Sequence, residues 1–156
     1  LPELGLLDTS SLQVVETRSK QTLFKRRLLT VEKECRITGI ADLRFLRASH
    51  IKPWSRCATG TERVDPNNGL LLSPDADYLF DRGWITFEDK GELVRSNELP
   101  TDVVNRIGLD LRLGRNCGDF TPEQRAYLDY HRNAIYEKAY KRATDPIREL
   151  LSTTGS

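Results

Sequence analysis

A chain of 156 residues, 38% of them apolar, is long enough for one domain with a modest core. No apolar run approaches the roughly 20 residues that a membrane-spanning helix needs, which argues against a membrane protein. The three cysteines are widely spaced and form no CxxC pair. Neither a disulfide framework nor a structural zinc site is therefore expected, and a reducing, cytoplasmic setting fits best.

The net charge of +1 hides an uneven distribution along the chain. Residues 1–60 hold 11 Lys and Arg against 6 Asp and Glu, whereas residues 61–100 hold 4 against 9. A basic section followed by an acidic one suits a polyanion partner together with a bound cation. Ordinary scatter of surface charge produces the same pattern, so charge alone does not decide between these interpretations.

The first part of the chain is interpreted as a lead-in followed by a helix. Residues 1–13 have the character of a linker, and the domain itself is expected over residues 14–150. The chain begins with Leu and contains no Met, which indicates a piece of a longer protein or a processed one. Over residues 14–33 apolar side chains recur at helical spacing, with basic side chains mostly opposite, so an amphipathic helix is predicted.

The central part of the chain predicts a strand, a long loop, a second strand and a short helix. Residues 35–39 (CRITG) indicate a short extended piece closed by glycine, and LRFLRASHI, from Leu43, predicts a strand. Residues 55–69 are rich in turn-forming residues, and GLLLS after them is a short apolar strand. SPDADYLFDRG, residues 73–83, predicts a helix with a serine cap, proline in its first turn and a terminating glycine.

The last part adds a hairpin and more helix. WITFEDKGELVRS, residues 84–96, alternates around a DKG turn and predicts a β-hairpin. Residues 99–107 predict a short helix, and a basic, glycine-containing loop follows. A long helix is predicted from Thr121 to about Thr144, because a threonine cap is followed by Pro and Glu. The mixture of elements predicts the α+β class.

Four polar residues stand out in the central unit: His50 at the end of the first strand, Asn68 after the loop, and Asp77 and Asp81 on the short helix. The two aspartates are four residues apart and share a helix face, where they repel each other unless a cation lies between them. The alternative for the acids is favourable interaction with the helix N-terminus. The alternative for His50 is a buried histidine with satisfied hydrogen bonds.

Two neighbouring residues bear on these alternatives. A Ser/His/Asp hydrolase that uses Ser49 is disfavoured, because adjacent residues on a strand point to opposite faces and Ser49 would not reach His50. The second histidine, His131, lies among tyrosines in a predicted helix and is expected either to pack or to face DNA.

The segments CRITG, ASHIKPW, NGLLL and DYLFDRGWITF, taken in this order, resemble the HNH endonuclease domain of the ββα-metal superfamily. The subgroup they resemble occurs in restriction and modification-dependent endonucleases. The resemblance covers about residues 20–140 and is strongest over 35–87. It implies an α+β fold with a ββα-metal (HNH) core at about residues 43–82, flanked by N-terminal and C-terminal helices.

The resemblance also implies roles for the polar residues. His50 is the expected general base, and Asn68 is expected to orient the base and tie down the loop. Asp77 and Asp81 fall at helix positions that ligate a metal, either Mg²⁺, Mn²⁺ or another divalent cation. Ser49 departs from the family, where many members place Asp or His as a further metal ligand, and a hydroxyl binds metal more weakly.

The implied partner is DNA. Arg44, Arg47, Lys52 and Arg82 lie near the motif and either hold DNA phosphates or form an ordinary solvated surface. The resemblance implies a recognition domain N-terminal to this piece, a homodimer if both strands are cut, and a bacterial cytoplasmic setting. Two other functions fit the same residues: a catalytically weak or inactive HNH-fold module that binds DNA, and the nuclease effector of another bacterial defence system.

Overall fold

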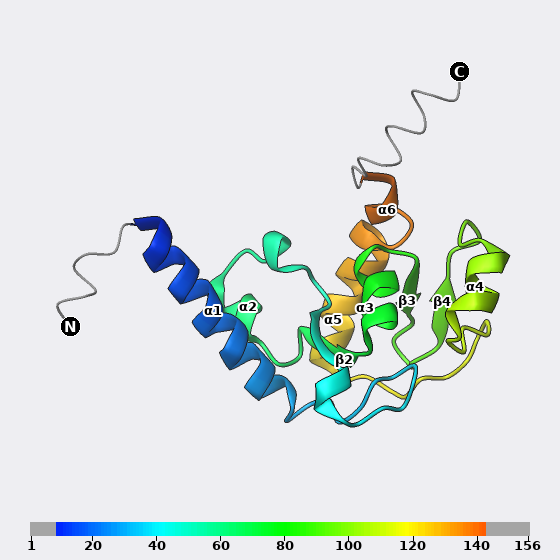
Figure 1. Ribbon diagram of the computed structural model, residues 1–156, viewed down its shortest axis with the longest axis horizontal. Helices are drawn as coiled ribbons and strands as arrows, with labels where there is room; N and C mark the ends of the chain where they lie inside the picture. Colours follow the sequence, from blue (N-terminus) through cyan, green and yellow to red (C-terminus); the bar gives the residue numbers. More distant parts are fainter. Residues whose placement is uncertain (1–8, 143–156) are drawn as a thin grey trace, which may run out of the picture.

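The computed structural model describes residues 9–142, which combine helices with short antiparallel strands in an α+β arrangement (Figure 1). The helices are α1 (Thr9–Leu28), α2 (Gly60–Val64), α3 (Pro74–Asp81), α4 (Thr101–Ile107), α5 (Pro122–Tyr130) and α6 (Ala139–Arg142). The strands are β1 (Arg47–His50), β2 (Gly69–Leu72), β3 (Ile85–Phe87) and β4 (Leu93–Arg95). Short 3₁₀ turns η2 (Leu43–Phe45) and η3 (Trp54–Arg56) flank β1, and a π-helical turn η4 (His131–Ile135) follows α5. Within this span, no helix combines the length and the apolar character required to cross a membrane.

The site is built on β1, β2 and α3, which follow one another in the chain. β1 pairs antiparallel with β2, so that Ser49 lies opposite Leu70 and His50 opposite Gly69. All four residues of β2 are buried, because α3 packs against one side of the hairpin and α1 against the other. Gly69 is required where α1 approaches, since a Cβ there would lie 2.5 Å from Cζ of Phe24.

The hydrophobic core surrounds this unit and extends to the second hairpin. Phe80 of α3 lies at the centre, with its ring 5.8 Å from that of Phe87 on β3. Phe87 in turn contacts Phe120, with ring centroids 5.7 Å apart. The hairpin predicted over residues 84–96 is present, with Ile85 paired to Arg95 and Phe87 to Leu93.

Two segments before the site differ from their predicted structure. The strand expected from Leu43 begins only at Arg47, because the carboxylate of Asp42 accepts a hydrogen bond from Arg44 N and caps a 3₁₀ turn instead. Residues 35–39 form a tight turn rather than an extended piece, with Gly39 N donating to Cys35 O at 2.9 Å. Gly39 has φ +74°, so the glycine does close this segment as expected.

The helix predicted from Thr121 to Thr144 is interrupted. The Thr121 cap is present, but α5 ends at Tyr130, the chain continues as η4, and Tyr136 is extended with ψ 129°. The cause is tertiary: Glu137 N leaves the helical pattern and donates to Gly83 O at 2.9 Å, with Glu137 at φ +59°. The end of the predicted helix and residues 143–150 of the expected domain lie outside the described residues.

The first helix is displaced toward the N-terminus relative to its prediction. It spans Thr9–Leu28 rather than residues 14–33, so part of the expected lead-in is helical, and residues 1–8 lie outside the described residues. Of its apolar side chains, Phe24 and Leu28 are buried. Those near its N-terminus are exposed, because the first turns of α1 extend past the rest of the fold (Figure 1).

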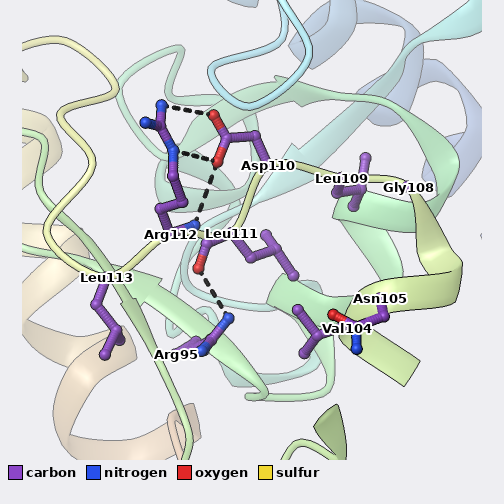
Figure 2. A pocket seen from close by; sticks show the side chains of 9 residues that line it. All are labelled: Arg95, Val104, Asn105, Gly108, Leu109, Asp110, Leu111, Arg112 and Leu113. Atoms are coloured by element: carbon purple, nitrogen blue, oxygen red, sulfur yellow. Dashed lines mark hydrogen bonds and ion pairs between the residues drawn. The ribbon is translucent and has the colours of Figure 1, made fainter. Parts of the chain in front are cut away.

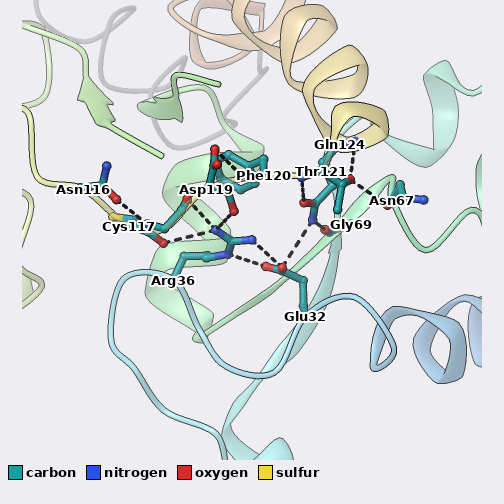
Figure 3. A network of polar contacts seen from close by, with 11 residues as sticks. Glu32, Arg36, Asn67, Gly69, Asn116, Cys117, Asp119, Phe120, Thr121 and Gln124 are labelled. Atoms are coloured by element: carbon teal, nitrogen blue, oxygen red, sulfur yellow. Dashed lines mark hydrogen bonds and ion pairs between the residues drawn. The ribbon is translucent and has the colours of Figure 1, made fainter. Parts of the chain in front are cut away.

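A buried ion pair joins the segment after α1 to the C-terminal half of the chain (Figure 3). The side chain of Glu32 is 2% exposed, and Arg36 donates to both of its oxygens, at 2.8 and 2.7 Å. Arg36 Nη1 also donates to the carbonyls of Gly118 and Asp119, at 2.7 and 2.8 Å. On the other side, Gln124 of α5 donates weakly to Glu32 at 3.4 Å, so one network holds three distant segments.

His131 packs inside the protein, which excludes the DNA-facing alternative. It is 1% exposed, and its ring stacks on Phe80 at 3.9 Å between centroids. Its two nitrogens bond Thr86 Oγ1 and Phe80 O, both at 2.8 Å, so the ring fastens η4 to the last turn of α3. Burial lowers the pKa of His131 to about 4, because the charged imidazolium loses its hydration there.

This buried histidine predicts a loss of stability in mild acid. The unfolded chain binds a proton on His131 near pH 6.5 and the folded chain only near pH 4, so folding opposes protonation between these values. The free energy of unfolding should fall by on the order of 3 kcal/mol from pH 6.5 to 4 through this group. Urea unfolding across that range measures it, with His131→Gln, which takes up no proton, as the comparison; equal falls in both proteins would contradict the prediction.

Candidate active site

β1 directs its side chains alternately to two sides of the hairpin, and the two sides carry different chemistry. Ser49 and Arg47 lie on the α3 side, where the Ser49 hydroxyl donates to Asp77 Oδ1. Arg47 Nη1 lies 3.7 Å from the other oxygen, Asp77 Oδ2. His50 lies on the α1 side, stacked against Phe24. Because successive side chains of a strand point to opposite sides, Ser49 contacts the carboxylate of Asp77 on one side of the hairpin, and the next residue, His50, lies on the other side.

Asp81 lies one helical turn after Asp77 and completes a small acidic group. Its side chain remains exposed, yet its pKa is raised, first by partial loss of hydration on the helix surface and then by the negative charge of Asp77. A bound cation would remove this repulsion. Two carboxylates and the Ser49 hydroxyl are all hard oxygen donors, so they fit a divalent cation such as Mg²⁺ that keeps several waters. Among residues 9–142, no group of three or more His, Cys, Asp or Glu side chains could hold a metal ion.

The imidazole of His50 is held on three sides. Its Nε2 bonds the carbonyl of Arg63 at 2.8 Å, which places the proton of the neutral ring on Nε2 and leaves the lone pair on Nδ1. One ring face stacks on Phe24 at 3.7 Å between centroids, and Trp54 presents its edge at 5.6 Å. Burial lowers the pKa of His50 and the bond to Arg63 opposes this, so the ring is neutral at pH 7 and able to accept a proton.

Asn68 fixes the loop that supplies this carbonyl. Its side chain is fully buried, and its Oδ1 accepts a hydrogen bond from Lys52 N at 2.7 Å. Its Nδ2 donates to Lys52 O at 3.2 Å and to Glu62 O at 3.1 Å. One amide therefore ties the residues after β1 to α2, and α2 places Arg63 against His50. The contact between Asn68 and the histidine is indirect.

A cleft of about 530 Å³ opens on the histidine side, between α1 and β1. Its walls include His50, Phe24 and Trp54 together with Arg47, whose guanidinium also approaches Asp77. The cleft is therefore lined by His50, and Arg47 connects it to the acidic group.

A second cavity, of about 690 Å³, lies beside β4 and α4 at the opposite end of the molecule from α1 (Figures 1 and 2). Its arginines are already engaged: Arg112 donates to Asp110 at 2.8 Å, and Arg95 donates to Leu111 O at 3.1 Å. It contains neither histidine nor any α3 carboxylate, so we place the candidate site at the α1 cleft.

Residues 35–88 match a family model described as HNH endonuclease. This match supports an HNH domain. The matched segment carries the turn at Cys35, the β1–β2 hairpin and α3, and with them the candidate site residues Ser49, His50, Asn68, Asp77 and Asp81. No match was found among curated proteins. The match supports a nuclease-type function for the HNH segment, as the motifs had indicated.

The four cations expected to hold DNA differ in their availability. Arg47 is 65% exposed and lies at the cleft. Arg82 is exposed beside Asp81, 5.3 Å above the Tyr78 ring, and Arg44 is exposed but bonded to Asp42 at 2.7 Å. Lys52 differs from expectation: its side chain is only 17% exposed and pairs with Glu62 at 3.1 Å, so its charge is used inside the protein.

Two parts of the site were missed by the sequence analysis. The carbonyl of Arg63 carries no side-chain signal, because any residue supplies a carbonyl oxygen. Phe24 was included only as one of the apolar side chains of the helix predicted over residues 14–33. Its position under His50 follows from the close packing of α1 on Gly69, which a sequence pattern does not specify.

The hydrogen bonds of Asn68 predict a selective loosening of the HNH segment. Asn68→Ala leaves the Lys52 N–H without its partner and removes one hydrogen bond from each of the Lys52 and Glu62 carbonyls, which should cost about 2–4 kcal/mol of unfolding free energy. Hydrogen exchange at the Lys52 amide should accelerate more than exchange within β2. The adjacent Asn67→Ala is the control, because Asn67 accepts a single side-chain bond, from Thr121 Oγ1; equal effects of the two substitutions would contradict the prediction.

Proposed function

We propose that this protein is a metal-dependent DNA endonuclease in which His50 is the general base. The observation that carries the proposal is the state of His50, a neutral imidazole with its Nε2 proton bonded to Arg63 O and its Nδ1 lone pair left for a substrate water. This histidine lines a cleft together with Arg47, which approaches Asp77 of α3. The match to an HNH endonuclease family supports the same reaction class.

The residues of the chain divide the work of phosphodiester hydrolysis. His50 accepts a proton from the attacking water at Nδ1, and the carbonyl of Arg63 stabilises the imidazolium that results. Asp77, Asp81 and Ser49 would hold the divalent cation, which when bound supplies charge neutralisation at the phosphate and the leaving oxygen. Arg47, beside Asp77, is placed to bind a phosphate oxygen.

We also propose that the domain serves a restriction or modification-dependent restriction enzyme. Support comes from the motif resemblance, and phosphate contacts of the kind proposed for Arg47 position a nuclease without specifying a sequence. Target recognition would then come from another domain. Because each chain has one His50, cutting both strands would require two copies or two successive binding events.

Replacing the base tests the mechanism directly. His50→Ala should reduce the nicking of supercoiled plasmid by about 10²–10⁴-fold, the usual contribution of a general base. His50→Gln is the matched variant, because glutamine fills more of the space above Phe24 but accepts no proton at neutral pH. Retained activity in both variants would contradict the role of His50. A wild-type protein that binds DNA but stays inert with Mg²⁺ and Mn²⁺ would instead favour the DNA-binding module.

If Asp77 ligates the metal, the Mg²⁺-dependent nicking activity should depend on the negative charge of its side chain. Asp77→Asn keeps an oxygen for the Ser49 hydrogen bond but removes the negative charge, so folding should be preserved while Mg²⁺-dependent nicking falls by roughly 100-fold or more. Asp75→Asn is the control on the same helix, because Asp75 is exposed in the first turn of α3. Nicking rates measured over a Mg²⁺ titration compare the variants, and equal losses in both would remove Asp77 from the ligand set.

A further inference from the structure

The outer wall of the cleft is formed by α1, which lies outside the segment that matches the HNH family. Arg18, Gln21 and Lys25 line it from one face of the helix, at the three- and four-residue spacing that puts side chains in a row. Arg47 and His50 face them from β1. Three cations therefore surround a cleft whose inner wall is the proposed base.

The charges on this wall are not neutralised by the protein. Many cations elsewhere in the fold have a carboxylate partner, such as Arg36 with Glu32 at 2.7 Å and Arg132 with Asp89 at 2.9 Å. Among the residues that the structure describes, no carboxylate pairs with Arg18 or Lys25, and both side chains are exposed. Unpaired cations gathered at one cleft create a positive potential that attracts an anion.

We propose that α1 is a phosphate-binding wall, on which Arg18 and Lys25 hold the backbone of the DNA strand that His50 cuts. This inference rests on the proposed function and identifies α1 as the element that binds the DNA substrate. The strand would lie along the cleft, between the α1 cations and Arg47, with the scissile phosphate next to His50.

The dimensions of the wall fit this ligand. Seven residues separate Arg18 from Lys25, so their Cα atoms are about 10 Å apart along the helix axis. This span is long enough for the two side chains to contact different phosphates of one strand. Most of the remaining lining is apolar, including Phe24, Leu46 and Trp54, and suits the faces of deoxyribose rings. A row of cations beside an apolar floor thus matches the alternation of phosphate and sugar.

Salt-dependent binding tests the wall separately from catalysis. Binding of a 20-base-pair DNA duplex is measured over a range of salt in the His50→Ala protein, without divalent cation, so that no cleavage occurs. Adding Arg18→Gln and Lys25→Gln should lower the slope of log Kd against log salt by about 2, because each lost phosphate contact removes roughly 0.9. Glutamine keeps the helix propensity, and thermal unfolding checks that the fold is unchanged.

A second pair of substitutions controls for the loss of charge. Arg27→Gln with Lys33→Gln removes the same two positive charges at exposed positions that do not line the cleft. Arg27 lies nine residues after Arg18, about half a turn round the helix from it. We expect this pair to change the slope by much less than the cleft pair. Equal changes in the two pairs would overturn the proposal.

Nicking by the otherwise wild-type protein separates this inference from the proposed function. In that background the cleft pair should raise KM at least tenfold and leave kcat within about threefold, since it weakens binding of ground and transition state alike. If the wild-type protein is active and the cleft pair and the control pair of substitutions have the same effect on DNA binding, the phosphate-binding wall is refuted and the proposed nuclease function is not. If only the cleft pair changes the slope, and the wild-type protein shows no cleavage with any divalent metal tested, the phosphate-binding wall is supported and the nuclease function is refuted. Absence of DNA binding would refute both.

Discussion

The buried pair between Glu32 and Arg36 is the contact on which the arrangement of the site depends. Two charges removed from water are costly, and here the cost is offset because Arg36 is bidentate to Glu32, donates to carbonyls of the 117–119 loop and lies 4.2 Å over the Phe120 ring. The pair stands between α1 and the HNH segment. By anchoring this junction to α5 and the later loop, it fixes α1 against the hairpin and so places Phe24 under His50.

A second constraint is the alternation of side chains along β1. Ser49 and His50 are neighbours in sequence, yet one bonds Asp77 of α3 and the other stacks on α1. The hairpin therefore separates the acidic group on one side from His50, the proposed base, on the other, and Arg47 reaches both regions from its edge. In the proposed reaction, a phosphodiester that contacts His50 and the carboxylates together would have to pass the end of β1. Asn68 holds the loop that follows this end of the strand.

The sequence predicted the parts of the site whose chemistry is local. The β1–β2–α3 order, the helix after Ser73 and the second hairpin followed from short patterns, because prolines, terminating glycines and alternation act over a few residues. Ser73 stands at the N-cap position of α3 as predicted, but its side chain makes no capping hydrogen bond. The failures were tertiary. The helix after Thr121 breaks because Glu137 N donates to Gly83 O, and the position of Lys52 is set by its ion pair with Glu62. The sequence around Glu137 and Lys52 does not indicate these partners. In the same way, no sequence pattern indicates that the carbonyl of Arg63 accepts the hydrogen bond from His50.

The site consequently extends beyond the segment that carries its motifs. Residues 35–88 contain the proposed base and the proposed metal ligands. The ring that stacks on His50, however, is that of Phe24 in α1, and the same ring packs closely against Gly69. Without α1 the imidazole would lose this apolar cover, and the rise in hydration would favour its charged form, which accepts no proton. In the proposed reaction α1 would meet two demands, because Phe24 covers the proposed base and favours its neutral form, and the cations of α1 would hold the polyanion. Protonation of an exposed histidine beside bound phosphate would otherwise be favoured by the negative charge of the substrate itself.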